Sequence, residues 1–167
     1  MVGRQPNFRD FVAARSAALM RTAFLLTGDW QRGEDLLQTA LLHCFGRWDR
    51  IDDHEAYVRR TLVRTYAGWR RRRWTGETPA HPLPDSPQTT DESTASDLRA
   101  DLLRILGELP PRQRAVVVLR YYEDMAESDV AEVLGISPGT VKSQAARGLS
   151  RLRDSPLVSA LIEESGR

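Results

Sequence analysis

Cysteine and long apolar runs are scarce in this chain. One of its 167 residues is a cysteine, Cys44, which excludes a disulfide scaffold and a thiolate zinc site and indicates a reducing compartment. No apolar run approaches the roughly 20 residues of a membrane span, and the first residues lack the apolar core of a signal peptide. We therefore expect a cytoplasmic protein that does not insert into a membrane.

Residue patterns typical of enzymes are also missing. His43, His54 and His81 are scattered without metal-ligand spacing, and the sequence contains neither a glycine-rich phosphate loop nor a nucleophile elbow. Cys44 falls on an apolar helix stripe, where we expect it to be a small buried hydrophobe. The sequence thus predicts no enzyme, no cofactor and no metal site.

Charge is distributed unevenly along the chain, although 24 basic and 23 acidic residues nearly cancel. Residues 1–74 hold 14 arginines and 8 acids, whereas residues 75–96 hold four prolines, four acids and no base. Such a segment cannot build a core, so we expect a flexible, acidic, proline-rich linker. The predicted organisation is a domain at 1–74, a linker at 75–96, a second domain at 97–153 and a tail at 154–167.

Apolar residues recur at helical spacing on both sides of the linker, and no sustained alternation predicts a strand. We therefore expect an all-α fold of two small helical domains. In the first domain, Gly28 ends the opening helix in a left-handed cap, Asp29 caps the second helix, and the third starts at Asp52 or Asp53. The predicted core stripes are Phe8, Phe11, Val12, Leu19 and Leu26; Leu37, Ala40, Leu41, Cys44, Phe45 and Trp48; and Val58, Leu62, Thr65 and Trp69.

The second domain is predicted to contain a helix-turn-helix. Gly135 marks the turn, Ser137 and Pro138 cap and open the second helix, and Ala131 and Val141 stand where the two helices pack. An ordinary helical hairpin is the alternative, but the exposed face of the second helix is polar and basic, as in helices that read base edges and bind phosphates. That face consists of Thr140, Lys142, Ser143, Gln144, Arg147 and Arg151.

Other helices of the second domain are marked by prolines and apolar stripes. A helix capped by Ser96 or Asp97 is expected to stop at Leu109-Pro110-Pro111, and Pro111 can open the next helix because a first-turn residue needs no N–H. The predicted apolar faces are Leu98, Leu102, Ile105 and Leu109; Val116, Leu119 and Tyr122; and Val130, Val133 and Leu134.

The third helix of the first domain is dense in arginine. From Ala56 to Trp74 it carries seven arginines and no acid, so their repulsion is uncompensated unless a polyanion binds. Tyr57, Tyr66, Trp69 and Trp74 are interleaved, with Trp69 expected in the core. Guanidinium groups beside aromatic rings suit the unstacked bases of single-stranded nucleic acid. An ordinary solvated helix face is the alternative interpretation.

Four segments within residues 7–153 carry a family resemblance: TGDWQRGEDLLQTALLHCFGRWDRI, EAYVRRTLVRTYAGWRRRRW, LGELPPRQRAVVVLRYYEDM and AEVLGISPGTVKSQAARGLSRLR. Together they resemble the extracytoplasmic-function (ECF) sigma factors of bacterial RNA polymerase, in particular the actinobacterial SigE-like subset. The resemblance implies a factor that binds core polymerase, recognises the minus-ten and minus-thirty-five promoter elements and promotes DNA opening.

The resemblance also implies which residues contact each partner. The coiled coil of the polymerase's largest subunit would bind Glu34, Asp35, Leu37 and Gln38, and the flap of the second-largest subunit would bind the second domain. The loop from Asp49 to Glu55 would hold a flipped base, the six polar residues of the helix-turn-helix would read the minus-thirty-five duplex, and the linker would thread the RNA channel. An anti-sigma factor is a further partner that the resemblance leaves open. The melted minus-ten strand would contact Arg60, Arg64, Thr65, Tyr66, Arg70, Arg71, Arg72 and Arg73.

Three positions depart from the family pattern. Thr39 replaces a common acid, Arg64 replaces a frequent asparagine, and Ala126 replaces the serine that usually caps the first helix of the helix-turn-helix, where Ser128 is the alternative cap. Two other functions are compatible with the helical pattern. One is a one-component helix-turn-helix regulator with an N-terminal sensor or dimerisation module, and the other is an RNA-binding adaptor.

Overall fold

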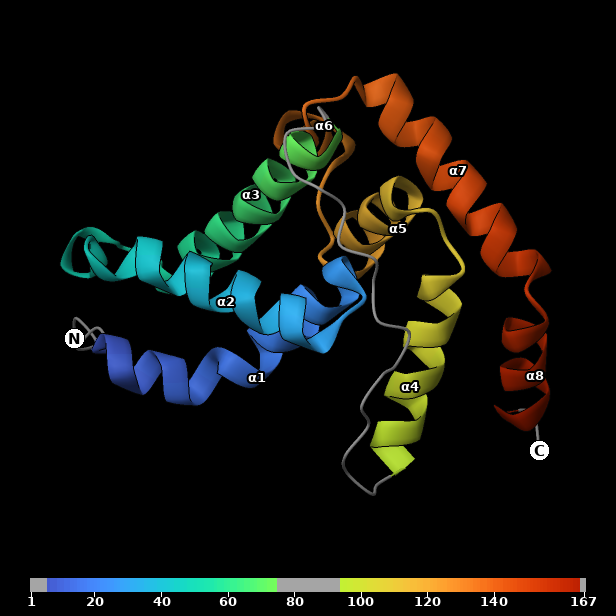
Figure 1. Cartoon of the computed structure of the whole chain (residues 1–167), viewed down its shortest axis with the longest axis horizontal. Coiled ribbons are helices and arrows are strands. Elements are labelled where there is room, and N and C mark those ends of the chain that lie inside the picture. The colour runs from blue at the N-terminus through green and yellow to red at the C-terminus, as the bar shows by residue number, and fades with distance from the viewer. Residues whose placement is uncertain (1–5, 75–93, 166–167) are drawn as a thin grey trace. The chain divides into compact units, whose positions relative to one another are not determined.

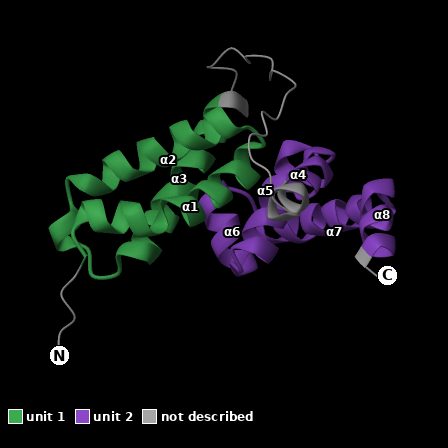
Figure 2. Cartoon of the chain, turned by 90° about the horizontal axis from the view of Figure 1, so that it is seen from below, with its two compact units in different colours: residues 1–82 green, residues 83–167 purple. Residues whose placement is uncertain are grey.

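The computed structural model describes residues 6–74 and 94–165, apart from the side chains of residues 73, 74, 94–99 and 165. Eight α-helices and no strand occur in these ranges (Figure 1), so the predicted all-α fold is confirmed. The chain divides into two compact units, unit 1 at Met1–Pro82 and unit 2 at Leu83–Arg167 (Figure 2). Most of the predicted linker, residues 75–93, lies outside the described residues.

Unit 1 consists of α1 (Phe8–Thr27), α2 (Trp30–Phe45), the 3-10 turn η1 (Trp48–Arg50) and α3 (His54–Trp74). The predicted boundaries are confirmed by their caps. Gly28 is left-handed, with φ of 71°, and the Asp29 carboxylate accepts a hydrogen bond from the Arg32 backbone N–H at 2.9 Å. The Asp53 carboxylate accepts from the Ala56 N–H at 3.1 Å, and α3 therefore starts where the sequence predicted.

The core of unit 1 forms where α1 and α3 both pack against α2. Because α2 is covered from two sides, its buried face is wider than the single predicted stripe and includes Leu36, which is fully buried. Two residues of the predicted stripe behave differently. Phe45 ends α2 and is 61% exposed, so its assignment to the core is wrong. Trp48 is buried as predicted, but within η1 and not as a continuation of α2.

Unit 2 consists of α4 (Thr94–Gly107), α5 (Pro111–Val117), the π-helical turn η2 (Val118–Tyr122), α6 (Glu127–Leu134), α7 (Pro138–Asp154) and α8 (Pro156–Ser165). Pro111 opens α5 as predicted. The first helix begins at Thr94, before the predicted caps Ser96 and Asp97, so it includes the end of the predicted linker. The predicted tail contains a helix, α8, that packs on α7 and α4.

Local chemistry defines the helix-turn-helix formed by α6 and α7. Gly135 ends α6 in the left-handed region, with φ of 68°, and the Ser137 hydroxyl accepts a hydrogen bond from the Thr140 N–H at 3.1 Å. Ala131 and Val141 are buried between the helices, as predicted. The expectation for Ser128 is wrong, because α6 already begins at Glu127 and its N-cap, Ala126, makes no side-chain hydrogen bond.

Close packing of α5 against α7 completes the core of unit 2. A Cβ atom at Gly148 would lie 2.7 Å from Cγ2 of Val117, so glycine permits this crossing. Two predicted core residues are exposed, namely Leu102 and Tyr122. Tyr122 ends the π-helical turn, which shifts it from the buried side that α-helical spacing predicted. On α4, Ile105 is buried as predicted, and Leu106, which was not predicted, is buried beside it.

Candidate nucleic-acid interface

The exposed face of α3 carries a stripe of three arginines, Arg60, Arg64 and Arg71. With 3.6 residues per turn, their positions fall within about 40° of arc around the helix axis. Arg72 is also exposed, on a neighbouring side of the helix, where Thr65 is half-buried and donates its hydroxyl to the Thr61 carbonyl at 2.7 Å. The side chain of Arg73, a further predicted contact, lies outside the described part of the chain.

Two of the predicted DNA contacts, Tyr66 and Arg70, are not on the surface of the free chain. They are only 2% and 8% exposed, and Arg70 Nε donates a hydrogen bond to the Tyr66 hydroxyl at 2.9 Å. The physical reason is helical spacing, because positions 58, 62, 66 and 70 follow each other every four residues along the buried side of α3. Trp69, predicted to be in the core, is only half-buried.

An acid compensates part of the basic charge on α3, contrary to the expectation of uncompensated repulsion. Glu55, just before the arginine run, forms an ion pair with Arg59 one turn later at 3.4 Å and a second ion pair with Arg15 of α1 at 3.1 Å. The basic stripe is therefore Arg60, Arg64 and Arg71, while Arg59 belongs to a separate ion-pair triad with Arg15 and Glu55.

The loop before α3 is held by an aromatic cluster. The His54 ring stacks on Trp48 with centroids 4.0 Å apart, and Nε2 of His54 lies 3.1 Å from the Trp48 carbonyl, to which it donates. Trp48 Nε1 in turn donates to the Pro6 carbonyl at 3.0 Å. Sequence reasoning missed His54 as a core residue, although its four-residue spacing from Val58 would have indicated it. Four loop side chains remain exposed between these anchors: Asp49, Arg50, Asp52 and Asp53.

The α2 residues predicted to contact polymerase divide into surface and core. Glu34, Asp35 and Gln38 are exposed, but Leu37 is buried, so its assignment to the contact surface is wrong. The signal was present in the sequence, because Leu37 also stood in the predicted core stripe. The same side of α2 continues through Leu42, which is 73% exposed, to Phe45.

Helix α7 presents the face that the sequence predicted. Lys142, Ser143, Arg147 and Arg151 are exposed, whereas Thr140 and Gln144 are half-buried. The Thr140 hydroxyl lies 2.9 Å from the Ser137 hydroxyl, and Ser143 donates its hydroxyl to the Thr140 carbonyl at 3.1 Å. The first turn of α7 is therefore fixed by side-chain hydrogen bonds, and the arginines project from its later turns. Arg153, which was not predicted, is also exposed near the end of α7.

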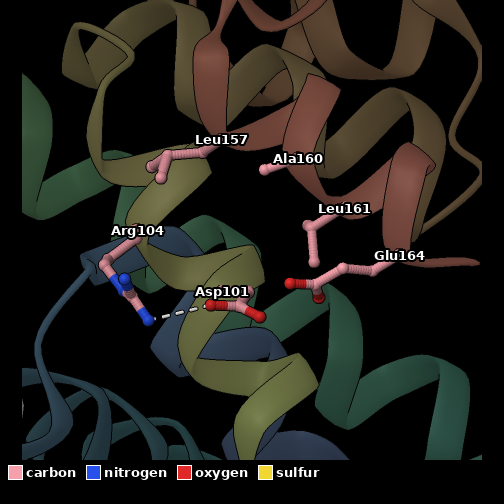
Figure 3. A pocket seen from close by; sticks show the side chains of 6 residues that line it. All are labelled: Asp101, Arg104, Leu157, Ala160, Leu161 and Glu164. Atoms are coloured by element: carbon pink, nitrogen blue, oxygen red, sulfur yellow. Dashed lines mark hydrogen bonds and ion pairs between the residues drawn. The ribbon is translucent and has the colours of Figure 1, made fainter.

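A pocket of about 180 Å³ lies in unit 2 between α4 and α8 (Figure 3). Arg104 Nη2 donates to Asp101 at 2.8 Å within it, and no predicted site residue lines it. In the described ranges, no group of three or more histidine, cysteine or acidic side chains is placed to hold a metal ion. None of the helices described by the structure is both long enough and apolar enough to span a membrane.

Comparisons with known proteins agree with this architecture. Residues 99–152, from α4 to α7, match the family model described as Sigma-70, region 4. The RNA polymerase sigma-E factor of Streptomyces coelicolor is 42% identical over 156 residues, which cover 92% of this chain and 88% of the relative. That of Streptomyces avermitilis is 44% identical over 156 residues, with 91% and 86% coverage.

The fold is also found in a solved sigma factor. The sigma factor RpoE from Bartonella quintana, crystallised with the anti-sigma factor NepR, superposes with a TM-score of 0.59 at 20% identity. The similarity covers 92% of this chain and 97% of that one.

The region 4 match and the two-unit helical fold define a sigma factor. With relatives above 40% identity over most of both chains, the protein belongs to the ECF sigma factors, in the group of the actinobacterial sigma-E factors. It acts with RNA polymerase in promoter recognition. The relatives do not favour a one-component regulator.

Proposed function

We propose that the two units divide promoter recognition between α3 and α7. The observation that carries this proposal is the contrast between two exposed basic helix faces, one of arginines on α3 and the other of short polar and basic residues on α7. Arginine beside aromatic rings suits a melted strand, and a helix that follows a helix-turn-helix turn suits the major groove of a duplex.

The minus-thirty-five duplex is assigned to α7. Its first turn is fixed by Ser137, so the helix enters a groove with Lys142 and Ser143 already placed. Arg147 and Arg151 follow on later turns and can reach guanine edges or phosphates. The half-buried Thr140 and Gln144 lie at the border of this contact surface.

The melted minus-ten strand is assigned to α3 and the preceding loop. Arg60, Arg64 and Arg71 bind phosphates along one stripe, and Arg72, Arg73 and Thr65 extend the contact. The exposed loop residues 49–53 surround a flipped base. Tyr66 and Arg70 support this surface from beneath it and do not contact DNA.

Core RNA polymerase is assigned to the exposed side of α2. Glu34, Asp35 and Gln38 are the polar contacts with the coiled coil of the largest subunit, and Leu42 and Phe45 add apolar area to the same side. Leu37 supports this side from the core. Unit 2 binds the flap of the second-largest subunit. Because RpoE was crystallised with NepR, we include an anti-sigma factor among the partners, and we place the protein in the cytoplasm with polymerase.

Holoenzyme reconstituted from core polymerase tests the division between the units. On promoters selected by this holoenzyme from a random library, Arg60→Gln/Arg64→Gln is expected to slow DNA opening, measured by permanganate reactivity, and to keep binding to the upstream duplex. Ser143→Ala/Arg147→Ala is expected to weaken upstream binding and to keep opening on a premelted template. Glu132→Gln on α6, exposed in unit 2, is the control. If both double variants impair the same step, either DNA opening or upstream binding, then α3 and α7 do not divide promoter recognition as proposed.

The predicted linker supplies a separate test. Its four acids suit the positively lined RNA channel, so neutralising them at constant length is expected to change the ratio of abortive to full-length RNA. The variant carries Glu77→Gln, Asp85→Asn, Asp91→Asn and Glu92→Gln. Equal RNA yields for variant and parent at several salt concentrations would show that the linker acts only as a spacer.

A further inference from the structure

One carboxylate, that of Glu55, lies between two arginines of unit 1. Its Oε2 is 3.1 Å from Nη2 of Arg15 on α1, and its Oε1 is 3.4 Å from Nη2 of Arg59 on α3. All three side chains are more than a third exposed. Exposed ion pairs contribute little to the stability of a fold, so Glu55 can exchange these two partners at little cost to the fold.

The charges of this triad do not cancel. Two guanidinium groups face one carboxylate, which leaves one positive charge in excess. A phosphodiester also carries one negative charge on two oxygens, and guanidinium binds carboxylate and phosphate through the same charge-assisted, bidentate hydrogen bonds. A backbone phosphate can therefore make the two contacts that Glu55 makes in the free chain.

The triad also borders the basic stripe of α3. Arg59 precedes Arg60 directly, about 1.5 Å away along the helix axis and about 100° around it. Arg59 therefore lies on the side of α3 next to the stripe, and a strand that extends past Arg60 around the helix reaches it. Because more than a third of each of the three side chains is exposed, Glu55 can rotate away without opening the core.

We propose that Arg15 and Arg59 form an additional phosphate-binding subsite for a nucleic-acid backbone, and that Glu55 occupies this subsite as an internal competitor. The inference rests on the proposed function, since it requires α3 to bind a strand. Glu55 then lowers the affinity of the protein for DNA in general and restricts phosphate binding to Arg60, Arg64 and Arg71.

The test is Glu55→Gln in the full chain, reconstituted with core polymerase. Binding to fluorescent oligodeoxythymidylate is followed by anisotropy across a salt series, with core alone as the blank. We expect a several-fold lower Kd and a slope of log K against log salt that is steeper by about 0.7 for each phosphate gained. Asp10→Asn is the matched control, because it removes the same charge from an exposed position of α1.

A background without the two arginines separates the subsite from general electrostatics. Glu55→Gln placed on Arg15→Gln/Arg59→Gln is expected to give no gain in affinity, since the released partners are absent. Equal effects of Glu55→Gln and Asp10→Asn, or a gain that persists without the arginines, would overturn the inference. A failure of the proposed function would give a different result from a failure of this inference. In that case Arg60→Gln/Arg64→Gln would leave the affinity for oligodeoxythymidylate unchanged.

Discussion

Helices α3 and α7 both present basic residues, but they obtain their exposed faces differently. Helix α7 begins after a left-handed Gly135 and a Ser137 cap, and its polar and buried positions separate cleanly around the axis. Helix α3 runs for 21 residues, and its arginines fall on both its exposed and its buried side. A basic run in a long helix therefore does not define a surface, because a neighbouring hydroxyl can accommodate a guanidinium in the core.

Helices α3 and α7 belong to different units, and we expect these units to unfold separately. Leu62 of α3 and Leu119 of η2 are both fully buried, and truncation of either to alanine is expected to cost about 2–5 kcal/mol. In a calorimetric scan, Leu62→Ala should lower one thermal transition and Leu119→Ala the other. A single transition lowered by both variants would show that the units unfold together.

The support beneath α3 is tested by Tyr66→Phe. This change removes the hydroxyl that accepts from Arg70 Nε, and loss of a buried hydrogen bond to a charged group is expected to cost about 1.5–3 kcal/mol. Urea unfolding of the full chain measures the effect. Tyr121→Phe, at an exposed tyrosine of η2, should change the unfolding free energy far less, and equal losses would contradict a supporting role for Tyr66.

Sequence readout is tested on α7 by Arg147→Ala. A bidentate contact to a base contributes about 1–3 kcal/mol of discrimination, so the variant holoenzyme should lose preference at particular base pairs of the upstream element. Competition binding against a set of single-base variants measures this. A uniform weakening at every sequence would mean that Arg147 contacts phosphate, as we propose for the arginine stripe of α3.

The smallest effect on stability is expected from Cys44, a buried residue of α2 in unit 1. Burial raises the pKa of this thiol above its ordinary value of 9.0, partly offset by a hydrogen bond with Thr61. The unfolded thiol therefore ionises before the folded one, so its contribution is complete below that ordinary value and is lost as pH rises above it. Thermal midpoints between neutral pH and about pH 10 should fall more steeply for the parent than for Cys44→Ala; parallel curves would contradict this.

The sequence predicted where these helices begin and end better than it predicted which of their side chains are buried. Gly28, Asp29, Gly135 and Ser137 act on the backbone within a few residues, so their effect does not depend on the rest of the fold. Whether a side chain is buried depends on which helix covers it. That is why Leu37, Tyr66 and Arg70 were assigned to contact surfaces although neighbouring helices cover them.

The sequence contains a helix signal in the segment of α8, which was predicted to be a tail. Ser155 and Pro156 open it as Ser137 and Pro138 open α7, and the Ser155 hydroxyl accepts from the Leu157 N–H at 3.3 Å. Apolar residues follow at helical spacing from Leu157 to Leu161. The acidic residues near the end of the predicted tail do not prevent a short amphipathic helix.

The hydrogen bond from Trp48 to Pro6 has a consequence for the entropy of the loop that follows. It connects the residues ahead of α1 to the start of that loop, and the His54 ring closes the other end against the same indole. With both ends anchored within a few residues, the intervening backbone has few conformations left to lose. The base that we propose for this loop would meet a frame whose ordering was completed when the chain folded, so more of the contact energy would remain as affinity.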